Sequence, residues 1–142
     1  MKIELAKSES DIKEAGRLLI QLRPQYSLEG IVDQIKKQQN SGYQIACAKE
    51  DELIVGVAGF IVGEKLAWGK HIYVDDLVTD KEKRSTGVGA ALIAWLREYG
   101  EENGCQQLHL DSSVVKHPAH RFYLRNGFNI ASHHFSITEL SS

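Results

Sequence analysis

The chain has 142 residues and a formal net charge of −2, and 42% of its residues are hydrophobic and 25% are charged. This length and composition predict one globular domain, residues 1–142, with a core that needs no disulfide. The weak negative charge argues against binding to nucleic acid or to acidic membranes. Cys47 and Cys105 lie in or beside apolar runs and are expected to be reduced. No signal-like or membrane-spanning run is evident, so we expect a cytoplasmic protein.

The first half of the chain shows the pattern of one strand, then of two helices, then of two strands. Ser10 or Asp11 is expected to cap the first helix, and Pro24 to end it. The strand-like run at 53–62 is almost continuously apolar, which predicts a central strand that is buried on both faces. Its Gly56 and Gly59 indicate a bend or close packing. The predicted elements are a strand at 2–7, helices at 8–22 and 27–39, and strands at 43–48 and 53–62.

The second half begins with a strand at 67–79 and continues with an amphipathic helix that ends at Asn103. A strand at 106–112 and a short helix at 118–126 follow. The last extended segment, 128–138, is expected to be broken into two. This order predicts an α/β (α+β) fold in which a mixed sheet carries helices on both faces.

A glycine-bearing turn, Arg84-x-x-Gly87-x-Gly89-Ala90, joins the strand at 67–79 to its helix. Ser85 and Thr86 are expected to cap the helix. The first amides of a helix lack intrahelical partners, and the glycines let a ligand approach the backbone. The turn therefore predicts a phosphate-binding cradle.

Two familiar phosphate loops do not fit this turn. A nucleotide-triphosphate P-loop needs a Lys-Ser/Thr pair after its last glycine, but Ala90 and Ala91 follow Gly89. The dinucleotide fingerprint needs a third small residue, and Leu92 stands at that position.

Two motifs together resemble the signatures of the GCN5-related N-acetyltransferase (GNAT) family. Residues 84–90 look like its acyl-CoA motif, and residues 119–128, Ala-His-Arg-Phe-Tyr-Leu-Arg-Asn-Gly-Phe, are similar to its Ala-x-x-Phe/Leu-Tyr-x-x-x-Gly-Phe motif. The resemblance extends over residues 43–137. It implies a single-domain GNAT-like fold with a mostly antiparallel sheet, and transfer of an acetyl group from acetyl-CoA to a primary amine. It further implies direct attack by the amine in a ternary complex.

The resemblance also implies a site for acetyl-CoA. Two strands would splay apart, and the pantetheine arm would bind along the exposed backbone as an added strand. The helix amides would hold the pyrophosphate. Lys116 replaces an asparagine found in many family members and would approach a CoA phosphate. The cofactor-binding residues implied are Leu77, Val78, Thr79, Arg84, Ser85, Thr86, Gly87, Val88, Gly89, Ala90, Lys116, Ala119 and Tyr123.

Three residues have implied roles in catalysis. The Leu77 N–H is the candidate oxyanion donor, and Tyr123 is the candidate general acid for the departing thiolate, unless its ring only packs against the sheet. Because strand residues alternate, Asp75 and Asp76 are expected on opposite faces. Asp75 is the preferred general base, and Asp76 or a water relay stays open as an alternative.

The amine acceptor is only broadly defined. Tyr26, Glu29, Asp75 and Asp76 are candidate contacts, and acidic groups would favour a cationic amine, either a small molecule or a protein amine. No Cys/His cluster has zinc spacing, so no metal is expected. The resemblance implies a possible homodimer. The alternative function is a catalytically silent acyl-CoA-binding regulatory module that uses the same cradle.

Overall fold

The computed structural model describes residues 1–84 and 86–141, and the chain divides into two compact units, Met1–Leu110 and Asp111–Ser142. Each unit is described by itself. The elements of the first unit are β1 (Lys2–Leu5), α1 (Glu9–Leu22), α2 (Leu28–Gln39), β2 (Gln44–Glu50), β3 (Leu53–Lys65), β4 (Gly69–Thr79), the 3-10 turn η1 (Lys81–Lys83), α3 (Val88–Glu102) and β5 (Gln107–Leu110).

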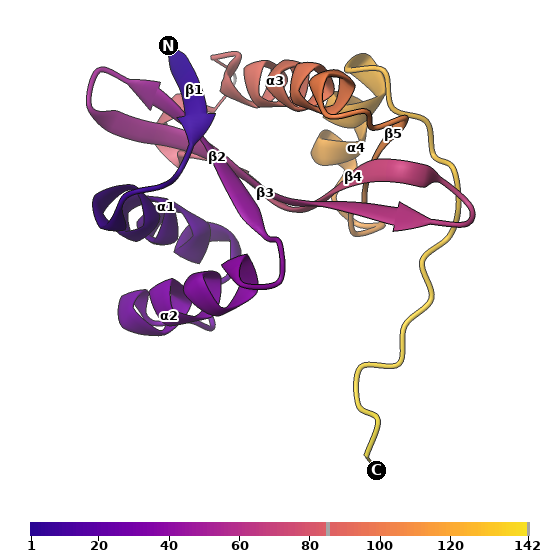
Figure 1. Ribbon diagram of the computed structural model, residues 1–142, viewed down its shortest axis with the longest axis horizontal. Coiled ribbons are helices and arrows are strands. Elements are labelled where there is room, and N and C mark those ends of the chain that lie inside the picture. The colour runs from indigo at the N-terminus through magenta and orange to yellow at the C-terminus, as the bar shows by residue number, and fades with distance from the viewer. Residues whose placement is uncertain (85, 142) are drawn as a thin grey trace. The chain divides into compact units, whose positions relative to one another are not determined.

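The five strands form one sheet in the order β1-β2-β3-β4-β5 (Figure 1). The first three pairings are antiparallel and the pairing of β4 with β5 is parallel. The predicted mixed, mostly antiparallel sheet is thereby confirmed. Strand β3 is central in the sheet, and its residues from Val55 to Phe60 are buried, as the apolar run at 53–62 predicted.

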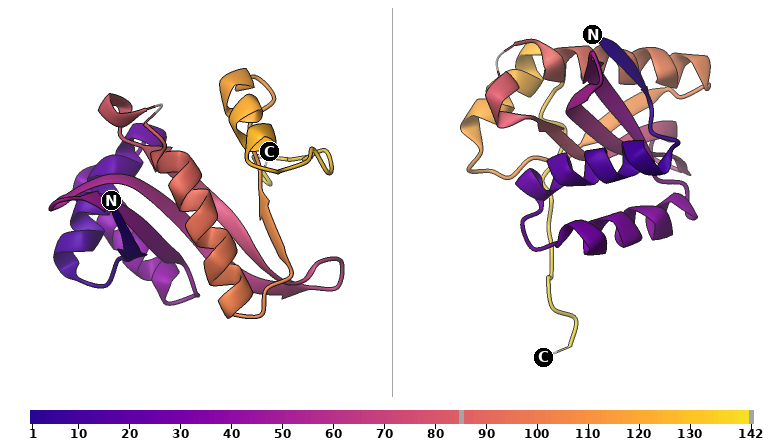
Figure 2. Two further views of the ribbon diagram at one scale, coloured as in Figure 1. Left: turned by 90° about the horizontal axis from the view of Figure 1, so that it is seen from above. Right: turned by 90° about the vertical axis from the view of Figure 1, so that its left-hand side faces the viewer.

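Helices cover both faces of this sheet. Figures 1 and 2 show α1 and α2 on one face and α3 on the other. On the α1 and α2 face, the apolar side chains of both helices pack on β2, β3 and β4. On the α3 face, Phe60 makes edge-on contacts with the rings of Trp95 and Tyr99, whose centroids lie 6.1 and 5.5 Å away.

Two of the three glycines of β3, Gly56 and Gly59, allow close packing on opposite faces of the sheet. A Cβ atom at Gly56 would lie 2.5 Å from the Val88 side chain of α3. A Cβ atom at Gly59 would lie 1.7 Å from the Tyr43 hydroxyl. Neither position has room for a side chain, which confirms the close packing that the sequence indicated.

The predicted helix caps are wrong at two places. Ser8, not Ser10 or Asp11, caps α1, and its Oγ accepts a hydrogen bond from the Asp11 N–H at 3.0 Å. The N-cap of α3 is Gly87, with no side-chain cap, and the Thr86 hydroxyl donates to the Lys83 carbonyl instead. A cap depends on where the chain enters the helix, and several serines and threonines near a start fit the same pattern.

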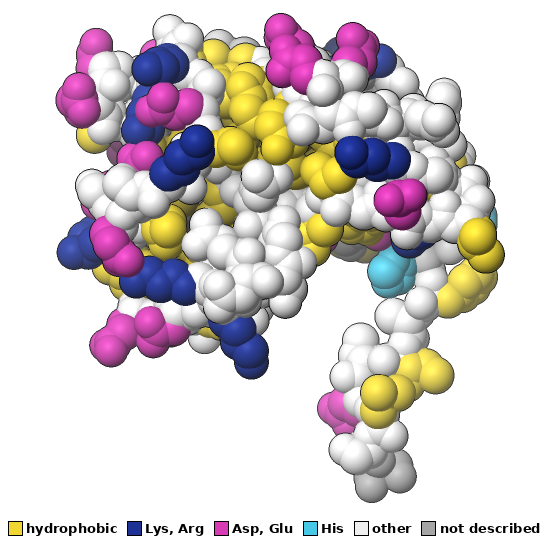
Figure 3. All heavy atoms as spheres, viewed as in Figure 1, with side chains coloured by type: hydrophobic (Ala, Val, Ile, Leu, Met, Phe, Trp, Pro, Cys, Tyr) yellow, Lys and Arg dark blue, Asp and Glu magenta, His cyan; other side chains and the backbone are white. Residues whose placement is uncertain are grey.

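Charged side chains of both signs are interspersed on the surface of the N-terminal helices (Figure 3). Lys36 lies 2.8 Å from Glu9, and Lys49 lies 2.9 Å from Asp11 and 3.0 Å from Glu4. This surface therefore offers no extended field of one sign.

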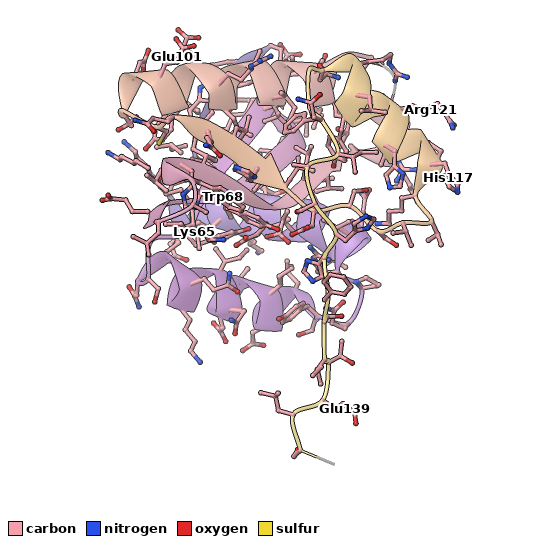
Figure 4. The ribbon with its side chains drawn as sticks, turned by 90° about the vertical axis from the view of Figure 1, so that its right-hand side faces the viewer. Lys65, Trp68, Glu101, His117, Arg121 and Glu139 are labelled. Atoms are coloured by element: carbon pink, nitrogen blue, oxygen red, sulfur yellow. The ribbon has the colours of Figure 1, made fainter. Side chains whose placement is uncertain are left out.

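The second unit contains α4 (His117–Arg125), which has a proline in its first turn as the sequence predicted. His117 and Arg121 both project from this helix (Figure 4). The predicted strands at 128–138 are wrong, because no strand or helix lies between Gly127 and Ser141. An alternating apolar pattern describes one face of a strand, but a strand also needs a neighbouring backbone to pair with, which the pattern does not supply.

Candidate functional site

The turn before α3 exposes the first amides of the helix. Gly87 is the N-cap residue and has a left-handed backbone conformation with φ of 91°, which glycine adopts without strain. A Cβ atom at Gly87 would meet no atom within 4 Å. The first hydrogen bond of the helix runs from the Ala91 N–H to the Gly87 carbonyl, so the N–H groups of residues 88–90 precede the intrahelical ladder.

The charge around this turn is only weakly positive, because Asp80 and Glu82 lie among the basic residues. The first turn of α3 contains no acidic residue. Lys81 and Lys83 of η1 and the exposed Arg84 come directly before it, and the helix dipole adds partial positive charge at the same end. Of the two lysines, Lys83 is paired with Glu50 at 3.6 Å. These features suit an anion such as a pyrophosphate. The predicted contact at Ser85 lies outside the described residues.

The strand β4 has a free edge over its last residues. Its parallel pairing with β5 runs from His71 to Val74 and ends at Leu110, whereas its antiparallel pairing with β3 continues to Thr79. Among the described residues, β4 beyond Val74 has no strand on that side. This unpaired backbone is what the splayed strands of the sequence analysis required.

The direction of the backbone groups on this edge follows from the strand register. The Asp80 N–H donates to the Val55 carbonyl of β3 at 2.8 Å. Because strand backbone groups alternate, the N–H of Val78 also points to β3, and those of Leu77 and Thr79 point to the free edge. Of the three residues predicted to contact the cofactor arm, Leu77 and Thr79 therefore offer their backbone groups. Val78 instead buries its side chain under α1 and α2.

A β-bulge interrupts β4 at Asp75. Asp76 is opposite Gly59 and Val74 is opposite Phe60, so Asp75 is an extra residue without a partner on β3. The expectation that Asp75 and Asp76 lie on opposite faces is wrong, since both line one cleft. A bulge breaks the two-residue alternation on which that expectation relied.

This cleft lies between the sheet and the first two helices and has a volume of about 290 Å³. Its floor is apolar and its walls carry an arginine, two aspartates, three glutamines and two tyrosines. The lining residues are Leu19, Arg23, Gln25, Tyr26, Ile31, Gln34, Ile35, Gln38, Tyr43, Asp75 and Asp76.

Arg23 and Tyr43 fix the bulge from two other elements. Arg23, the C-cap residue of α1, donates from Nε to Asp76 Oδ1 at 3.0 Å and from its terminal nitrogen to the Asp75 carbonyl at 3.1 Å. The buried Tyr43 hydroxyl donates to Asp76 Oδ2 at 2.7 Å. Both oxygens of the Asp76 carboxylate therefore have donors.

The two aspartates differ in their surroundings. Among the described residues, no side chain or N–H donates to the Asp75 carboxylate. Asp75 is exposed as a residue, but partial desolvation in the cleft and the neighbouring Asp76 raise the pKa of its carboxyl above the usual value, and Arg23 opposes this only partly. Burial, with Asp76 beside it, also raises the pKa of the Tyr43 phenol, which keeps this hydroxyl a donor at neutral pH.

The structure brings together three of the four predicted acceptor contacts, Tyr26, Asp75 and Asp76. Glu29 is exposed and does not line the cleft. Arg23 and Tyr43 were not among the residues predicted for the site. A tyrosine that begins an otherwise apolar strand, with a glycine available opposite, is the signal that its hydroxyl needs a buried partner.

The remaining predicted residues belong to the second unit. Lys116 is exposed and is the N-cap residue of α4, and Ala119 is part-buried on that helix. The Tyr123 ring makes edge-on contacts with Phe122 and Phe128, with centroids 5.4 and 5.6 Å away. Burial raises the pKa of the Tyr123 phenol, so it is protonated at neutral pH.

Two properties of the described residues bear on other functions. None of the helices combines the length and apolarity that crossing a membrane requires. In residues 1–84 and 86–141, no three histidine, cysteine or acidic side chains are grouped so that they could hold a metal ion.

Comparison with known proteins agrees with this geometry. A family model described as "Acetyltransferase (GNAT) family" matches residues 12–128. The chain is 26% identical to the uncharacterized N-acetyltransferase YhdJ of Bacillus subtilis, over 90% of this chain and 92% of that protein. It is 29% identical to glucosamine 6-phosphate N-acetyltransferase of Trypanosoma brucei brucei, over 84% of both. A crystal structure of a Trypanosoma brucei acetyltransferase superposes with a TM-score of 0.74 and 28% identity, covering 97% of this chain and all of the other.

Proposed function

Because the chain belongs to the acetyltransferase (GNAT) family, a family of acyltransferases, we propose that it moves an acetyl group from acetyl-CoA to a primary amine. The observation that carries this proposal is the combination of a free β4 edge with, a few residues later, a helix start that has no side-chain cap and no acidic residue in its first turn. The free edge suits the peptide-like pantetheine arm of CoA, and the helix start suits the pyrophosphate of CoA.

The reaction in this proposal is direct attack within a ternary complex. The amine nitrogen forms a bond to the thioester carbonyl carbon, and the carbon–sulfur bond then breaks. The Leu77 N–H stabilises the charge that develops on the carbonyl oxygen, because it points to the free edge of β4. The thiolate takes a proton from the Tyr123 hydroxyl.

The attacking amine gives its proton to Asp75 in this proposal. Asp76 is held by Arg23 and Tyr43, so each of its oxygens already accepts a hydrogen bond and it is less available than Asp75. The raised pKa of Asp75 makes it a better proton acceptor than an ordinary carboxylate. A water relay between the amine and Asp75 would serve the same purpose.

The proposed setting is the cytoplasm and the proposed assembly is a homodimer. Cys47 and Cys105 are both free thiols, which supports a reducing compartment. Apolar side chains on the C-terminal segment, such as Phe135 and Leu140, are 91% and 96% exposed, which supports a covering partner. Sedimentation velocity of the full chain tests the dimer, and a monomer at micromolar concentration would contradict it.

The experiment that tests the function is release of free CoA thiol from acetyl-CoA with a panel of primary amines. We expect amine-dependent release, and a loss of about 10- to 1,000-fold in kcat for Tyr123→Phe, which keeps the ring and removes the proton donor. The matched control is Tyr99→Phe, because the Tyr99 hydroxyl lies on α3 and bonds Gln44 at 3.2 Å. Binding of acetyl-CoA without turnover of any amine would instead identify a silent acyl-CoA-binding module.

A further inference from the structure

We propose that the cleft between the sheet and helices α1 and α2 selects a hydroxylated, cationic amine without an anionic group, of which an amino sugar is the simplest example. This inference rests on the proposed function, because it names the class of its acceptor. The cleft belongs entirely to the unit Met1–Leu110. Its volume of about 290 Å³ suits a small molecule of monosaccharide size.

The charge of the cleft favours a cation. Its lining contains one arginine and two aspartates and no lysine, histidine or glutamate, which leaves a net charge of −1. The Asp75 carboxylate is the one whose oxygens have no donor among the described residues. An ammonium group near Asp75 therefore gains an ion pair where a phosphate or carboxylate would meet repulsion.

Arg23 does not offset this for an anionic ligand. Its Nε and a terminal nitrogen both lie 3.0 Å from Asp76 Oδ1, and the same terminal nitrogen donates to the Asp75 carbonyl. These contacts hold the guanidinium against the bulge. A phosphate could reach the other terminal nitrogen of Arg23, whose side chain is 43% exposed, but the charge of that guanidinium is already balanced by Asp76, and the Asp75 carboxylate beside it would repel the phosphate.

The other walls suit hydroxyl groups. Gln34 donates from Nε2 to Gln38 Oε1 at 3.0 Å, which orients the two amides and leaves a carbonyl oxygen on Gln34 and amide hydrogens on Gln38. Gln25 and the Tyr26 side chain border the same space. Neutral donors and acceptors over an apolar floor of Leu19, Ile31 and Ile35 match the hydroxyls and the apolar face of a sugar ring.

The proposed preference for an amine without an anionic group distinguishes this chain from one of its relatives. The Trypanosoma brucei brucei protein is named for an acceptor that carries a phosphate, glucosamine 6-phosphate. Glucosamine and glucosamine 6-phosphate differ only by that group, so they form a matched pair of probes. We expect the described cleft to prefer the unphosphorylated member.

The test is calorimetric titration of both sugars into the full-length protein, with CoA present and again without it. We expect glucosamine to bind at least about tenfold more tightly than glucosamine 6-phosphate. Tighter or equal binding of the phosphate, or no binding of either sugar, overturns the inference. Failure of CoA to bind instead counts against the proposed function, and the titrations without CoA still measure the selectivity.

A pair of variants checks that the cleft causes the preference. Gln34→Lys adds a cation to the cleft wall and is expected to reduce the preference for glucosamine by about tenfold. Gln39→Lys makes the same change at the end of the same helix, on a residue that does not line the cleft, and is expected to leave the preference unchanged. Equal effects of the two variants would show that overall charge, and not the cleft, sets the selectivity.

Discussion

At the level of single residues, the site depends on a difference between two neighbouring carboxylates. The Asp76 carboxylate is held by hydrogen bonds, and the Asp75 carboxylate is not. The Asp76 carboxylate accepts hydrogen bonds from Arg23 and from the buried Tyr43. The pKa of the Asp75 carboxyl is raised above its usual value. The sequence supplied both aspartates but not this difference, because Arg23 and Tyr43 reach them from distant elements. The sequence shows which residue types are present, but which of them contact one another depends on the tertiary structure.

The hydroxyl of Tyr43 is expected to contribute measurably to stability. Tyr43→Phe keeps the buried ring and removes a donor to a carboxylate, so we expect a loss of about 1.5–3 kcal/mol in the free energy of unfolding, measured by urea denaturation. Tyr99→Phe removes a bond to a neutral amide and should cost about 0.5–1.5 kcal/mol. Equal losses in both variants would mean that the charge of Asp76 adds nothing.

The raised pKa of Asp75 gives a prediction with a defined sign. A carboxyl group whose folded-state pKa lies above its unfolded value binds protons more tightly when folded, so its ionisation lowers stability as pH rises through that window. Asp75→Asn should therefore have a higher Tm than wild type at pH 7, and the difference should shrink as pH falls toward the ordinary value of 3.8. Thermal unfolding across this pH range provides the measurement, and a lower Tm at pH 7 would contradict the assignment.

At the scale of elements, β4 serves two purposes along its length. From His71 to Val74 it is an internal strand, and after its bulge it becomes an edge with free backbone groups. The sequence predicted the strand, the cradle and the helix after it, because apolar periodicity and glycine positions are local signals. It did not predict the bulge, since a bulge is a property of the register between two strands.

The small residues of β3 are expected to be required for this register. Gly59→Ala would drive a Cβ atom to 1.7 Å from the Tyr43 hydroxyl, next to the bulge, and we expect overpacking to cost about 1–3 kcal/mol in the free energy of unfolding. Gly63→Ala, on the same strand, meets its nearest atom at an ordinary 3.6 Å and should be neutral or slightly stabilising. A stable Gly59→Ala protein would show that Tyr43 can move without cost.

At the scale of the whole molecule, the family and the fold class were the most predictable features. Two motifs in the right order indicated the family, and the family match over residues 12–128 confirmed it. The C-terminal strands were wrong, because the pattern at 128–138 does not say which backbone would pair with it. The single domain over residues 1–142 and the roles of the site residues stay predictions.

The start of α3 is proposed to bind the pyrophosphate of acetyl-CoA, and calorimetric titration with acetyl-CoA measures this binding. The variant is Gly89→Trp, which places a large side chain in the first turn of the helix, and the control is Ala94→Trp on an exposed position of the same helix. We expect binding to wild type and to Ala94→Trp, and a loss of about 100-fold or more in affinity for Gly89→Trp. No binding to folded wild type, or equal binding to all three proteins, would contradict it.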